Sequence, residues 1–312
     1  MTDKGRRDVP GGGTFRRIRS RSAGARVKIA YQGFPGAFSE AAAAGLFPAA
    51  DLVPQRTFGD VFAALRDGSV AGAVVPVENS HAGMVADVYD LLREDDGSMI
   101  VAEAIVRVRY GLLGVPGATL DGIRVARSHP QSLAQCDSFL RTHGIEPEVA
   151  YDNAGAAADV ARAADPSVAA LASGRAARRY GLTVLAAGIE TSPNNATRFF
   201  ALAPRGNAML ADAIPAAMRS GRPKTSLAYV TANVPGALLR TLQPFATVGV
   251  QLTKIESRPS RVAAWDYVFY LDFDGDPAVS PASDALEMMR RSCAWVNVLG
   301  TYPAAVEALE PD

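Results

Sequence analysis

Residues 27–186 alternate between short apolar runs and Ala-rich segments that are long enough for helices. The apolar runs have the length and composition of buried strands, and helix-ending residues such as Gly45 and Pro48 close the segments between them. Strands that alternate with helices form a parallel or mixed sheet with helices on both faces. The alternation therefore predicts an α/β fold.

The order of these elements predicts two lobes of similar size. The first ends in a long apolar alternation at 100–113, and the run at 197–203 has to return to it. The chain then crosses twice between lobe 27–112 with 188–204 and lobe 113–187, which leaves a cleft between them. The expected strands are 27–31, 52–56, 71–75, 122–127, 148–151, 168–171 and 183–186, and the expected helices are 37–46, 59–66, 84–93, 131–141, 154–164 and 174–180.

A third unit follows a segment rich in Pro and Gly. We interpret residues 205–224 as a linker with a short helix at 209–218. Residues 225–305 then carry strand and helix signals in the order βαββαβ, which is the ferredoxin-like order. The expected strands are 226–232, 250–256, 265–273 and 295–299, and the expected helices are 236–245 and 282–293.

The net charge of zero hides a basic N-terminal segment. Residues 1–26 hold eight Lys/Arg and two Asp, whereas the rest of the chain holds 24 basic and 30 acidic residues. With so few large apolar residues, 1–26 are predicted to be a disordered basic tail. An arm for nucleic acid or membrane is the alternative, but the acidic body argues against nucleic acid as the main partner.

Other patterns point to chemistry without a metal or cofactor. No apolar run approaches the roughly 18 residues that span a membrane, and the N-terminus lacks the apolar core of a secretory signal. Cys136 and Cys293 lie far apart, and the three His residues lack metal-ligand spacing. Motifs for binding nucleotides are missing as well. We therefore expect a cytoplasmic protein with no metal and no cofactor.

A polar cluster at residues 194–198 precedes the apolar run that begins at Phe199. It combines two Asn, the hydroxyl of Thr197 and the guanidinium of Arg198. Such groups at the mouth of a strand could bind and protonate a small, oxygen-rich anion. The alternative is a polar loop that only caps the strand, because short motifs often occur by chance.

Three further polar loops fall where a strand ends and a helix begins, which is the ligand-binding edge of an open α/β sheet. Residues 33–39 hold glycines that allow close backbone approach, and the helix that follows favours an anion. Residues 76–83 include polar side chains that either meet a ligand or cap the next helix. In residues 128–135, Ser128 suits a helix cap, Gln135 lies on one helix face with Gln131, and His129 is interpreted as a local loop residue.

In the third unit, residues 233–239 begin a helix, and 256–259 follow a strand. A helix N-terminus beside a polar turn can hold the carboxylate and ammonium groups of a free amino acid. Ordinary helix capping and a surface turn explain the same residues equally well.

Taken in order, these motifs resemble prephenate dehydratase with a C-terminal ACT regulatory domain. The family commonly has a longer polar residue in place of Ala82 and a small one in place of Met84, so the shape of that loop stays open. No chorismate mutase domain is present, as in the monofunctional form. The resemblance covers 27–303 and rests on 75–80 with Gly83, 128–136, 195–199, 233–239, 255–259 and 300–303.

The resemblance implies a two-lobed, periplasmic-binding-protein-like catalytic domain over 27–204 that converts prephenate to phenylpyruvate, water and carbon dioxide in phenylalanine biosynthesis. Thr197 would assist the leaving hydroxyl, polarised by Arg198 or by an amide. Ser128, Asn79 and Ser80 would bind carboxylate or keto oxygens. The carboxylate of Glu78 would repel a dianion, so one interpretation gives Glu78 a structural role. The expected catalytic residues are Thr197, Ser128, Asn79, Gln135, Arg198, Glu78, Ser80 and Phe199.

The resemblance also implies regulation by L-phenylalanine at a boundary between two ACT domains of a homodimer or homotetramer. Removing 222–312 is then expected to abolish inhibition and to leave some turnover. Two alternatives remain, namely arogenate dehydratase and a non-catalytic two-lobed module that binds a solute. The expected effector residues are Asn233, Gly236, Ala237, Leu238, Glu256, Ser257 and Arg258.

Overall fold

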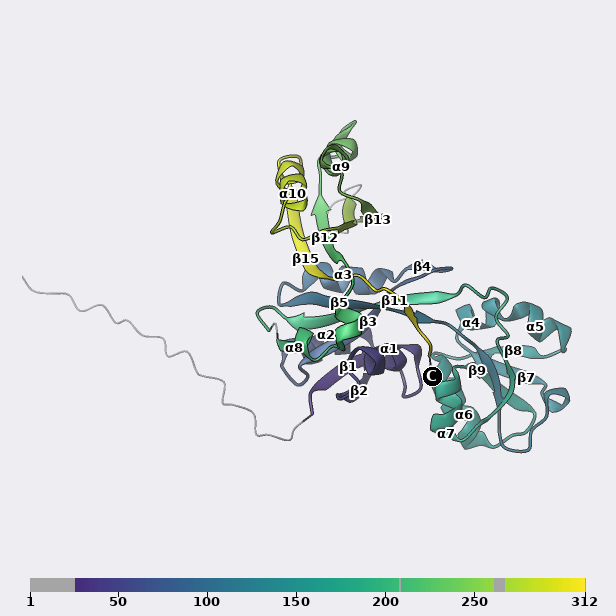
Figure 1. Cartoon of the computed structure of the whole chain (residues 1–312). Helices are drawn as coiled ribbons and strands as arrows, with labels where there is room; N and C mark the ends of the chain where they lie inside the picture. Colours follow the sequence, from purple (N-terminus) through teal and green to yellow (C-terminus); the bar gives the residue numbers. More distant parts are fainter. Residues whose placement is uncertain (1–25, 208, 261–266, 312) are drawn as a thin grey trace, which may run out of the picture.

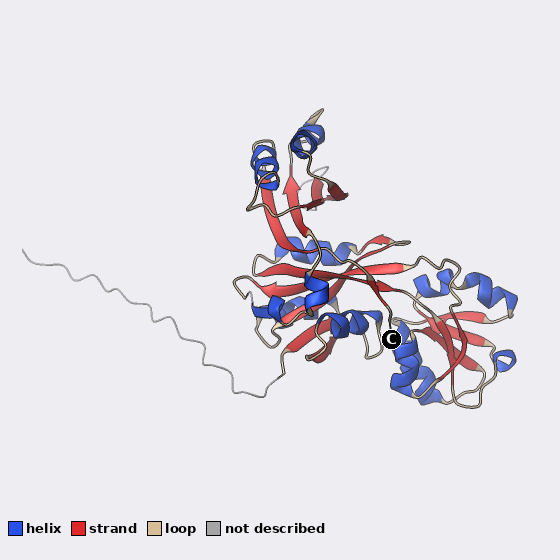
Figure 2. Cartoon of the chain, in the orientation of Figure 1, coloured by secondary structure: helices blue, strands red, loops and turns tan. Residues whose placement is uncertain are grey.

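The computed structural model describes residues 26–207, 209–260 and 267–311 (Figure 1). The predicted basic tail lies outside this range, apart from Arg26, which is 3.9 Å from Asp51. The described chain forms three sheets, and the third unit stands on the first lobe with the second lobe beside it (Figure 1). Helices and strands alternate through both lobes (Figure 2), which confirms the α/β class.

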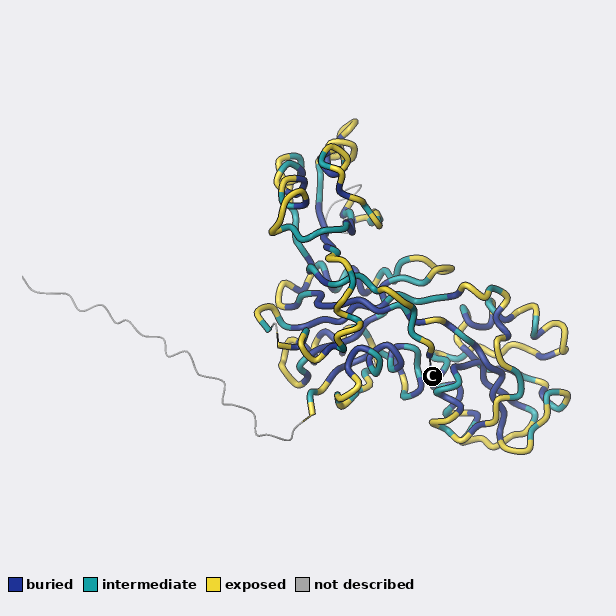
Figure 3. Tube along the Cα trace, in the orientation of Figure 1, coloured by how far each residue is buried: buried dark blue, intermediate teal, exposed yellow. Residues whose placement is uncertain are grey.

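The first lobe is a mixed sheet in the order β16-β5-β11-β3-β1-β2, with β4 paired to β3. β11 runs antiparallel between β5 and β3, so the late segment 196–204 returns to the first lobe. Residues 199–203 of this segment are buried (Figure 3). The elements are β1 (Lys28–Gln32), α1 (Phe38–Leu46), β2 (Asp51–Gln55), α2 (Phe58–Arg66), β3 (Gly72–Asn79), β4 (Gly83–Met84), α3 (Ala86–Glu94), β5 (Ser98–Arg107) and β11 (Ala196–Pro204).

The second lobe is a sheet in the order β10-β6-β9-β7-β8. The helix expected over 131–141 is two helices that meet at Cys136, whose φ of −109° and ψ of 9° interrupt the helical path. The Cys136 side chain is fully buried at this break. The elements are β6 (Gly111–Gly114), a 3₁₀ turn (Leu120–Gly122), β7 (Val125–Ser128), α4 (Pro130–Gln135), α5 (Asp137–Thr142), β8 (Glu146–Val149), α6 (Asn153–Ala163), β9 (Val168–Ala172), α7 (Gly174–Tyr180) and β10 (Thr183–Ala187).

Two crossover segments, 108–110 and 188–195, join the lobes and are tied to each other. Glu190 accepts hydrogen bonds from the Tyr110 backbone N–H and from the Arg109 guanidinium, both at 2.9 Å. Glu190 is only 9% exposed, so this carboxylate is held by neighbours instead of by water. The two crossings therefore behave as one fixed joint beside the cleft.

The third unit has the strand order β13-β14-β12-β15, all antiparallel, as in a ferredoxin-like βαββαβ fold. The helix expected at 209–218 is two short turns separated by Pro215, which lacks a backbone donor. The elements are α8 (Met209–Asp212), a 3₁₀ turn (Ala216–Arg219), β12 (Pro223–Val230), α9 (Ala237–Val248), β13 (Leu252–Pro259), β14 (Tyr267–Asp274), α10 (Ala282–Arg290) and β15 (Trp295–Pro303).

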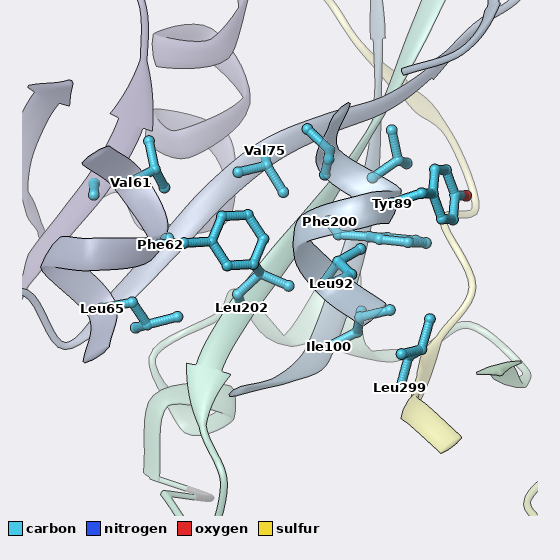
Figure 4. Close-up of a cluster of buried hydrophobic side chains, with 14 of the residues drawn as sticks. Val61, Phe62, Leu65, Val75, Tyr89, Leu92, Ile100, Phe200, Leu202 and Leu299 are labelled. Atoms are coloured by element: carbon cyan, nitrogen blue, oxygen red, sulfur yellow. The ribbon is translucent and has the colours of Figure 1, made fainter. Parts of the chain in front are cut away.

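The helix-free face of this third sheet packs on the first lobe in a shared core (Figure 4). Tyr270 of β14 lies 4.8 Å from the Tyr89 ring of α3, and Tyr302 of β15 lies 5.5 Å from the Phe200 ring of β11. Removing 222–312 would expose the rings of Tyr89 and Phe200 to water. This packing therefore does not support the expectation that the shortened chain leaves some turnover.

The chain beyond the third unit returns to the first lobe. β16 (Ala308–Leu309) pairs in parallel with β5 at the sheet edge, and Arg107 lies 3.0 Å from Glu310. Gly45 of α1 leaves room for the Leu309 side chain. The third unit is thus joined to the first lobe by a shared core and by a C-terminal strap.

The buried carboxylate of Glu103 on β5 gathers partners from three segments. It accepts from Arg198 Nε at 2.6 Å, from Lys224 Nζ at 2.7 Å and from the Ala305 backbone N–H at 2.8 Å. Burial alone would raise the pKa of Glu103, but Arg198 and Lys224 outweigh it and lower the pKa below 4.5. The stabilisation is therefore complete above about pH 4.5 and is lost as the pH falls through the folded-state pKa.

Glu103→Gln should destabilise the protein by about 3–5 kcal/mol near neutral pH, because two buried cations lose their carboxylate. Thermal unfolding measured at about pH 7 and at about pH 3.5 checks this, and the variant should lose less stability on acidification than the parent. The matched control is Glu148→Gln, from the exposed pair of Glu148 with Arg127. Equal melting of parent and Glu103→Gln at both pH values would contradict the prediction.

Candidate active site

A cleft of about 330 Å³ lies between the two lobes. A larger cavity of about 660 Å³ shares Asp152 with this cleft, but the polar side chains of β3 and β11 converge in the smaller cleft. Its lining residues come from both lobes and from one crossover. They include Gly36, Ala37, Phe38, Ser39, Asn79, Tyr110, Gln131, Ser132, Asp152, Asn153, Ser173, Thr197 and Phe199.

Thr197 and Asn79 face each other across the β11–β3 pairing. Asn79 Nδ2 donates to Thr197 Oγ1 at 3.0 Å, and Asn79 Oδ1 accepts from the backbone N–H groups of His81 and Ala82. Because those backbone donors fix which end of the amide is oxygen, Nδ2 must face the hydroxyl. Thr197 Oγ1 thus accepts a hydrogen bond, which polarises its O–H toward the cleft.

A chain of amides connects this pair to the second lobe. Asn79 Nδ2 also lies 2.9 Å from Asn195 Oδ1, and Asn195 Nδ2 donates to Gln135 Oε1 of α4 at 2.8 Å. Asn195 is 2% exposed, and neither it nor Gln135 lines the cleft. Gln135 and Asn195 therefore orient Asn79, and the orienting role of Asn195 was not anticipated from the sequence.

The opposite wall is organised by Asn153 at the start of α6. Asn153 Oδ1 accepts from Ser128 Oγ at 2.8 Å and from the His129 N–H at 3.1 Å, and it lies 2.9 Å from Ser132 Oγ. With Oδ1 occupied, Nδ2 is the atom that Asn153 presents to the cleft. Sequence reasoning missed Asn153, because an Asn at a helix start is usually a cap; here the cap is Asp152.

Ser128 does not reach the cleft. It is fully buried, and its Oγ lies 2.6 Å from the Leu171 carbonyl as well as beside Asn153. The expectation that Ser128 binds a substrate oxygen is therefore wrong in this structure, and Ser128 instead orients Asn153. Strand alternation explains this, because the last residue of β7 points into the lobe.

Four helices, α1, α4, α6 and α7, begin at the cleft. Their N-terminal N–H groups and dipoles favour a negatively charged ligand. The cleft lining, within the described residues, contains neither Lys nor Arg. The site therefore attracts an anion with neutral donors and partial charges instead of a full counter-charge. From the 33–39 loop, which was expected to offer backbone donors to an anion, Gly36, Ala37, Phe38 and Ser39 line the cleft.

Two ionisable groups on the cleft wall have shifted pKa values. Burial raises the pKa of Tyr110 to about 12, so its phenol keeps its proton at neutral pH, with Oη 2.9 Å from Ser132 Oγ. Burial also raises the pKa of Asp152, although its hydrogen bond from the Gly155 N–H opposes this. Asp152 is the only acidic side chain among the described residues that line the cleft.

Arg198 and Glu78 point away from the cleft, on the opposite face of the sheet. Arg198 bonds to Glu103, Asp272 and Tyr302, and the neighbours Tyr302, Asp272 and Glu103 raise its pKa despite burial. Of the two groups expected to polarise Thr197, Arg198 or an amide, the amide of Asn79 lies against the hydroxyl and Arg198 does not. Glu78 lies 2.9 Å from Lys254 of β13, in line with a structural role.

Of the expected residues Ser80 and Phe199, only Phe199 lines the cleft. Ser80 Oγ accepts from the Ala196 N–H and donates to the Asn194 carbonyl, both at 3.1 Å. Ser80 is exposed and fastens β3 to β11 outside the cleft, so the expectation that it binds substrate is not met. Phe199 is 1% exposed and supplies an apolar wall of the cleft.

The expected effector residues lie on α9 and on the edge strand β13. Gly236 is the N-cap residue of α9 and has a φ of +76°, Ala237 is buried, and Leu238 is 38% exposed. Glu256, Ser257 and Arg258 belong to β13 and do not follow it, because β13 extends to Pro259. Arg258 Nη2 donates to Asp90 of α3 at 3.0 Å, so its side chain faces the first lobe. Asn233 has a partner of its own.

The fold and the cleft are those of an α/β enzyme that handles a small anion between two lobes. Residues 29–207 match the family model for prephenate dehydratase. The chain is 38% identical over 293 residues to "Arogenate dehydratase/prephenate dehydratase 1, chloroplastic" of Arabidopsis thaliana, which covers 89% of this chain and 72% of that protein. It is 36% identical over 277 residues to a "Bifunctional N-acyl-homoserine lactone acylase/prephenate dehydratase" of Komagataeibacter europaeus, covering 89% and 96%.

Among solved structures, the prephenate dehydratase of Arthrobacter aurescens in complex with L-Phe superposes with a TM-score of 0.79. The two chains are 30% identical, and the match covers 89% of this chain and 90% of that one. The chain belongs to the prephenate dehydratase family, and the prediction of a dehydratase is confirmed. Within the described residues, no helix is both long and apolar enough to cross a membrane. A cytoplasmic setting stays a prediction.

Thr197→Ala and Asn79→Ala should each lower kcat by about 10² or more, because one removes the hydroxyl and the other its polarising donor. Thr197→Ser should keep much of the activity. Asn79→Asp preserves the shape of the side chain but not the donor, so it should resemble Asn79→Ala. Steady-state rates with prephenate check the series, and an Asn79→Asp enzyme within about threefold of the parent would remove this hydrogen bond from catalysis.

Proposed function

We propose that the chain converts prephenate to phenylpyruvate, water and carbon dioxide. The observation that carries this proposal is the Thr197 hydroxyl, which accepts from Asn79 Nδ2 at 3.0 Å and faces an anion-attracting cleft. The ring carboxylate leaves as carbon dioxide, and the electron pair of the broken C–C bond flows into the ring. The C–O bond to the hydroxyl at C4 breaks in the same step, and a proton from solvent that passes through Thr197 makes the departing group water.

Neutral donors suit this reaction better than cations would. The ring carboxylate loses its charge as carbon dioxide forms, so a cation beside it would stabilise the ground state more than the transition state. Helix N-termini and the Asn153 amide offer weaker, partial charges that can hold the pyruvyl end of the dianion. Formation of an aromatic ring drives the reaction forward, and no redox step is required.

Three aromatic side chains give the cleft an apolar wall. The rings of Phe38 and Tyr110 are in edge-to-face contact, with their centres 5.7 Å apart, and Phe199 lies on the β11 side. These side chains come from the first lobe, the crossover and the catalytic strand respectively. We propose that the substrate ring packs against this wall, with its C4 hydroxyl at Thr197 and its carboxylates at the helix N-termini.

Arogenate dehydration is the alternative from the same family, since the Arabidopsis relative carries both activities in its name. Arogenate differs from prephenate by an ammonium group in place of the keto oxygen. Asp152 is the acid that could pair with that ammonium. A purely non-catalytic binding module is disfavoured by the family membership, and absence of turnover with both substrates would revive it.

Steady-state kcat/KM values with prephenate and with arogenate test the substrate choice. Asp152→Asn keeps a side chain that can cap α6, so it should leave prephenate turnover within about twofold and lower arogenate turnover by about tenfold. Equal losses with both substrates would show that Asp152 does not distinguish the ammonium group of arogenate from the keto oxygen of prephenate.

We further propose that residues 225–305 form an ACT domain, that two such domains pair, and that L-phenylalanine binds at their boundary and inhibits the enzyme. Support comes from the ferredoxin-like strand order and from the L-Phe in the Arthrobacter relative. The outer side of α9 and β13 also carries exposed apolar side chains, including Leu239 at 66% and Ile255 at 44%. A second copy that covers these side chains would give at least a homodimer, or a homotetramer.

Leu239→Lys should weaken self-association and inhibition by L-phenylalanine together, because it places a charge in the proposed apolar interface. Basal turnover should stay within about twofold. Val306→Lys, at another exposed apolar residue outside α9 and β13, is the matched control. Light scattering and prephenate kinetics with and without L-phenylalanine provide the readouts. Unchanged association of Leu239→Lys would place the interface elsewhere.

A further inference from the structure

Arg198 joins the catalytic strand to the third unit with a single side chain. Its three guanidinium nitrogens have separate partners: Nε donates to Glu103 at 2.6 Å, Nη1 to Asp272 at 2.6 Å and Nη2 to the Tyr302 hydroxyl at 2.9 Å. Glu103 lies on the neighbouring strand β5, whereas Asp272 and Tyr302 belong to β14 and β15. The residue beside Thr197 is therefore held by two different units of the protein.

The environment makes this attachment stiff. The side chains of Arg198, Glu103 and Asp272 are 13%, 1% and 3% exposed, so water screens their charges weakly. The guanidinium also lies over the Phe200 ring, 4.7 Å from its centre. A planar fork with a partner at each nitrogen and a ring beneath it has little freedom to rotate. The backbone at residue 198 is fixed accordingly.

The pairing of β11 with β3 is irregular at this point, although the pairing of β11 with β5 on its other side is regular over residues 196–199. Arg198 pairs with Glu78, but Phe199 pairs with Pro76, so Val77 is an extra residue on β3. A bulge interrupts the ladder and lets a strand end shift locally. Asn79 is the last residue of β3, and Thr197 is its partner near the start of β11, just beyond the bulge. Their 3.0 Å hydrogen bond depends on the register of the two strands there.

We propose that Arg198 is a positioning residue that sets the Thr197 hydroxyl against Asn79, and that Asp272 and Tyr302 of the third unit hold it in place. The third unit then contributes to the catalytic geometry through this link in addition to binding an effector. The inference rests on the proposed dehydration, in which Thr197 serves the leaving hydroxyl.

Asp272→Asn tests the link from the third unit, because it removes the charge and keeps the shape. We expect kcat with prephenate to fall by about tenfold while KM changes less than about twofold, as for a displaced catalytic group. Tyr302→Phe removes only the hydroxyl, and a loss of about threefold in kcat is expected. Thermal unfolding establishes whether each variant is folded. If Asp272→Asn does not fold, the kcat of Tyr302→Phe tests the proposal.

Asp90→Asn is the matched control. It removes a carboxylate that pairs with Arg258 at 3.0 Å across the same interface between third unit and first lobe, but on α3 and away from β11. Its kcat should stay within about twofold of the parent. If Asp272→Asn and Tyr302→Phe behave like Asp90→Asn, or if their losses fall on KM alone, the cluster only joins the units and the proposal is overturned.

A readout that does not depend on turnover separates this proposal from the proposed function. The ¹³C-methyl NMR resonance of Thr197 should change its chemical shift in Asp272→Asn and keep it in Asp90→Asn. A parent enzyme that dehydrates arogenate but not prephenate would refute the choice of substrate, and the same variants would then be compared with arogenate. A Thr197 resonance unmoved by Asp272→Asn would refute the positioning role in either case.

Discussion

The alternation of side chains along β11 is the constraint on which the rest of the molecule depends. Thr197 and Phe199 face the cleft, so Arg198 between them must face the other side of the sheet. A guanidinium cannot remain unpaired in a buried site, and its carboxylate and phenol partners come from β5, β14 and β15. The residue next to the cleft hydroxyl therefore helps to fix the third unit on the first lobe, together with the shared core and the C-terminal strap.

Much of the fold could be predicted because it follows from local patterns. Strand and helix signals placed most elements within a few residues, and the return of 197–203 followed from the need to bury an apolar run. The break between α4 and α5 could not be seen, because Cys136 is compatible with a helix and only the buried packing around it ends α4. Likewise β13 continues through Pro259, which an edge strand tolerates.

The candidate site was predicted less completely, for a physical reason. Residues 194–198 were interpreted as one polar cluster at the mouth of the strand, so strand alternation was not applied to Arg198. It was placed beside Thr197, whereas its side chain lies on the opposite face of the sheet. Asn153 was missed because its importance comes from three donors that converge on one oxygen from β7 and α4. Such convergence is a property of tertiary structure, and no spacing in the sequence records it.

The lobes are held together on both sides of the cleft. This restricts the ways in which the third unit could change the rate of the reaction in the cleft. Ser173 Oγ donates to the Gly36 carbonyl at 2.7 Å, and Arg175 lies 2.9 Å from Glu40. On the other side, Gln135 of the second lobe bonds Asn195 beside β11. An effector that acted by rotating whole lobes would have to break these bonds together.

A small shift of β11 would be cheaper than such a rotation. A shift confined to the start of β11 would disturb the Asn195 amide chain, the hydrogen bond between Asn79 and Thr197 and the nearest pairs with β3 and β5. Couplings between sites commonly supply roughly 1–3 kcal/mol. The third unit touches β11 through Arg198 and through the Phe200 ring. The contacts therefore favour a route to the active site along the strand over a route through the joint between the lobes.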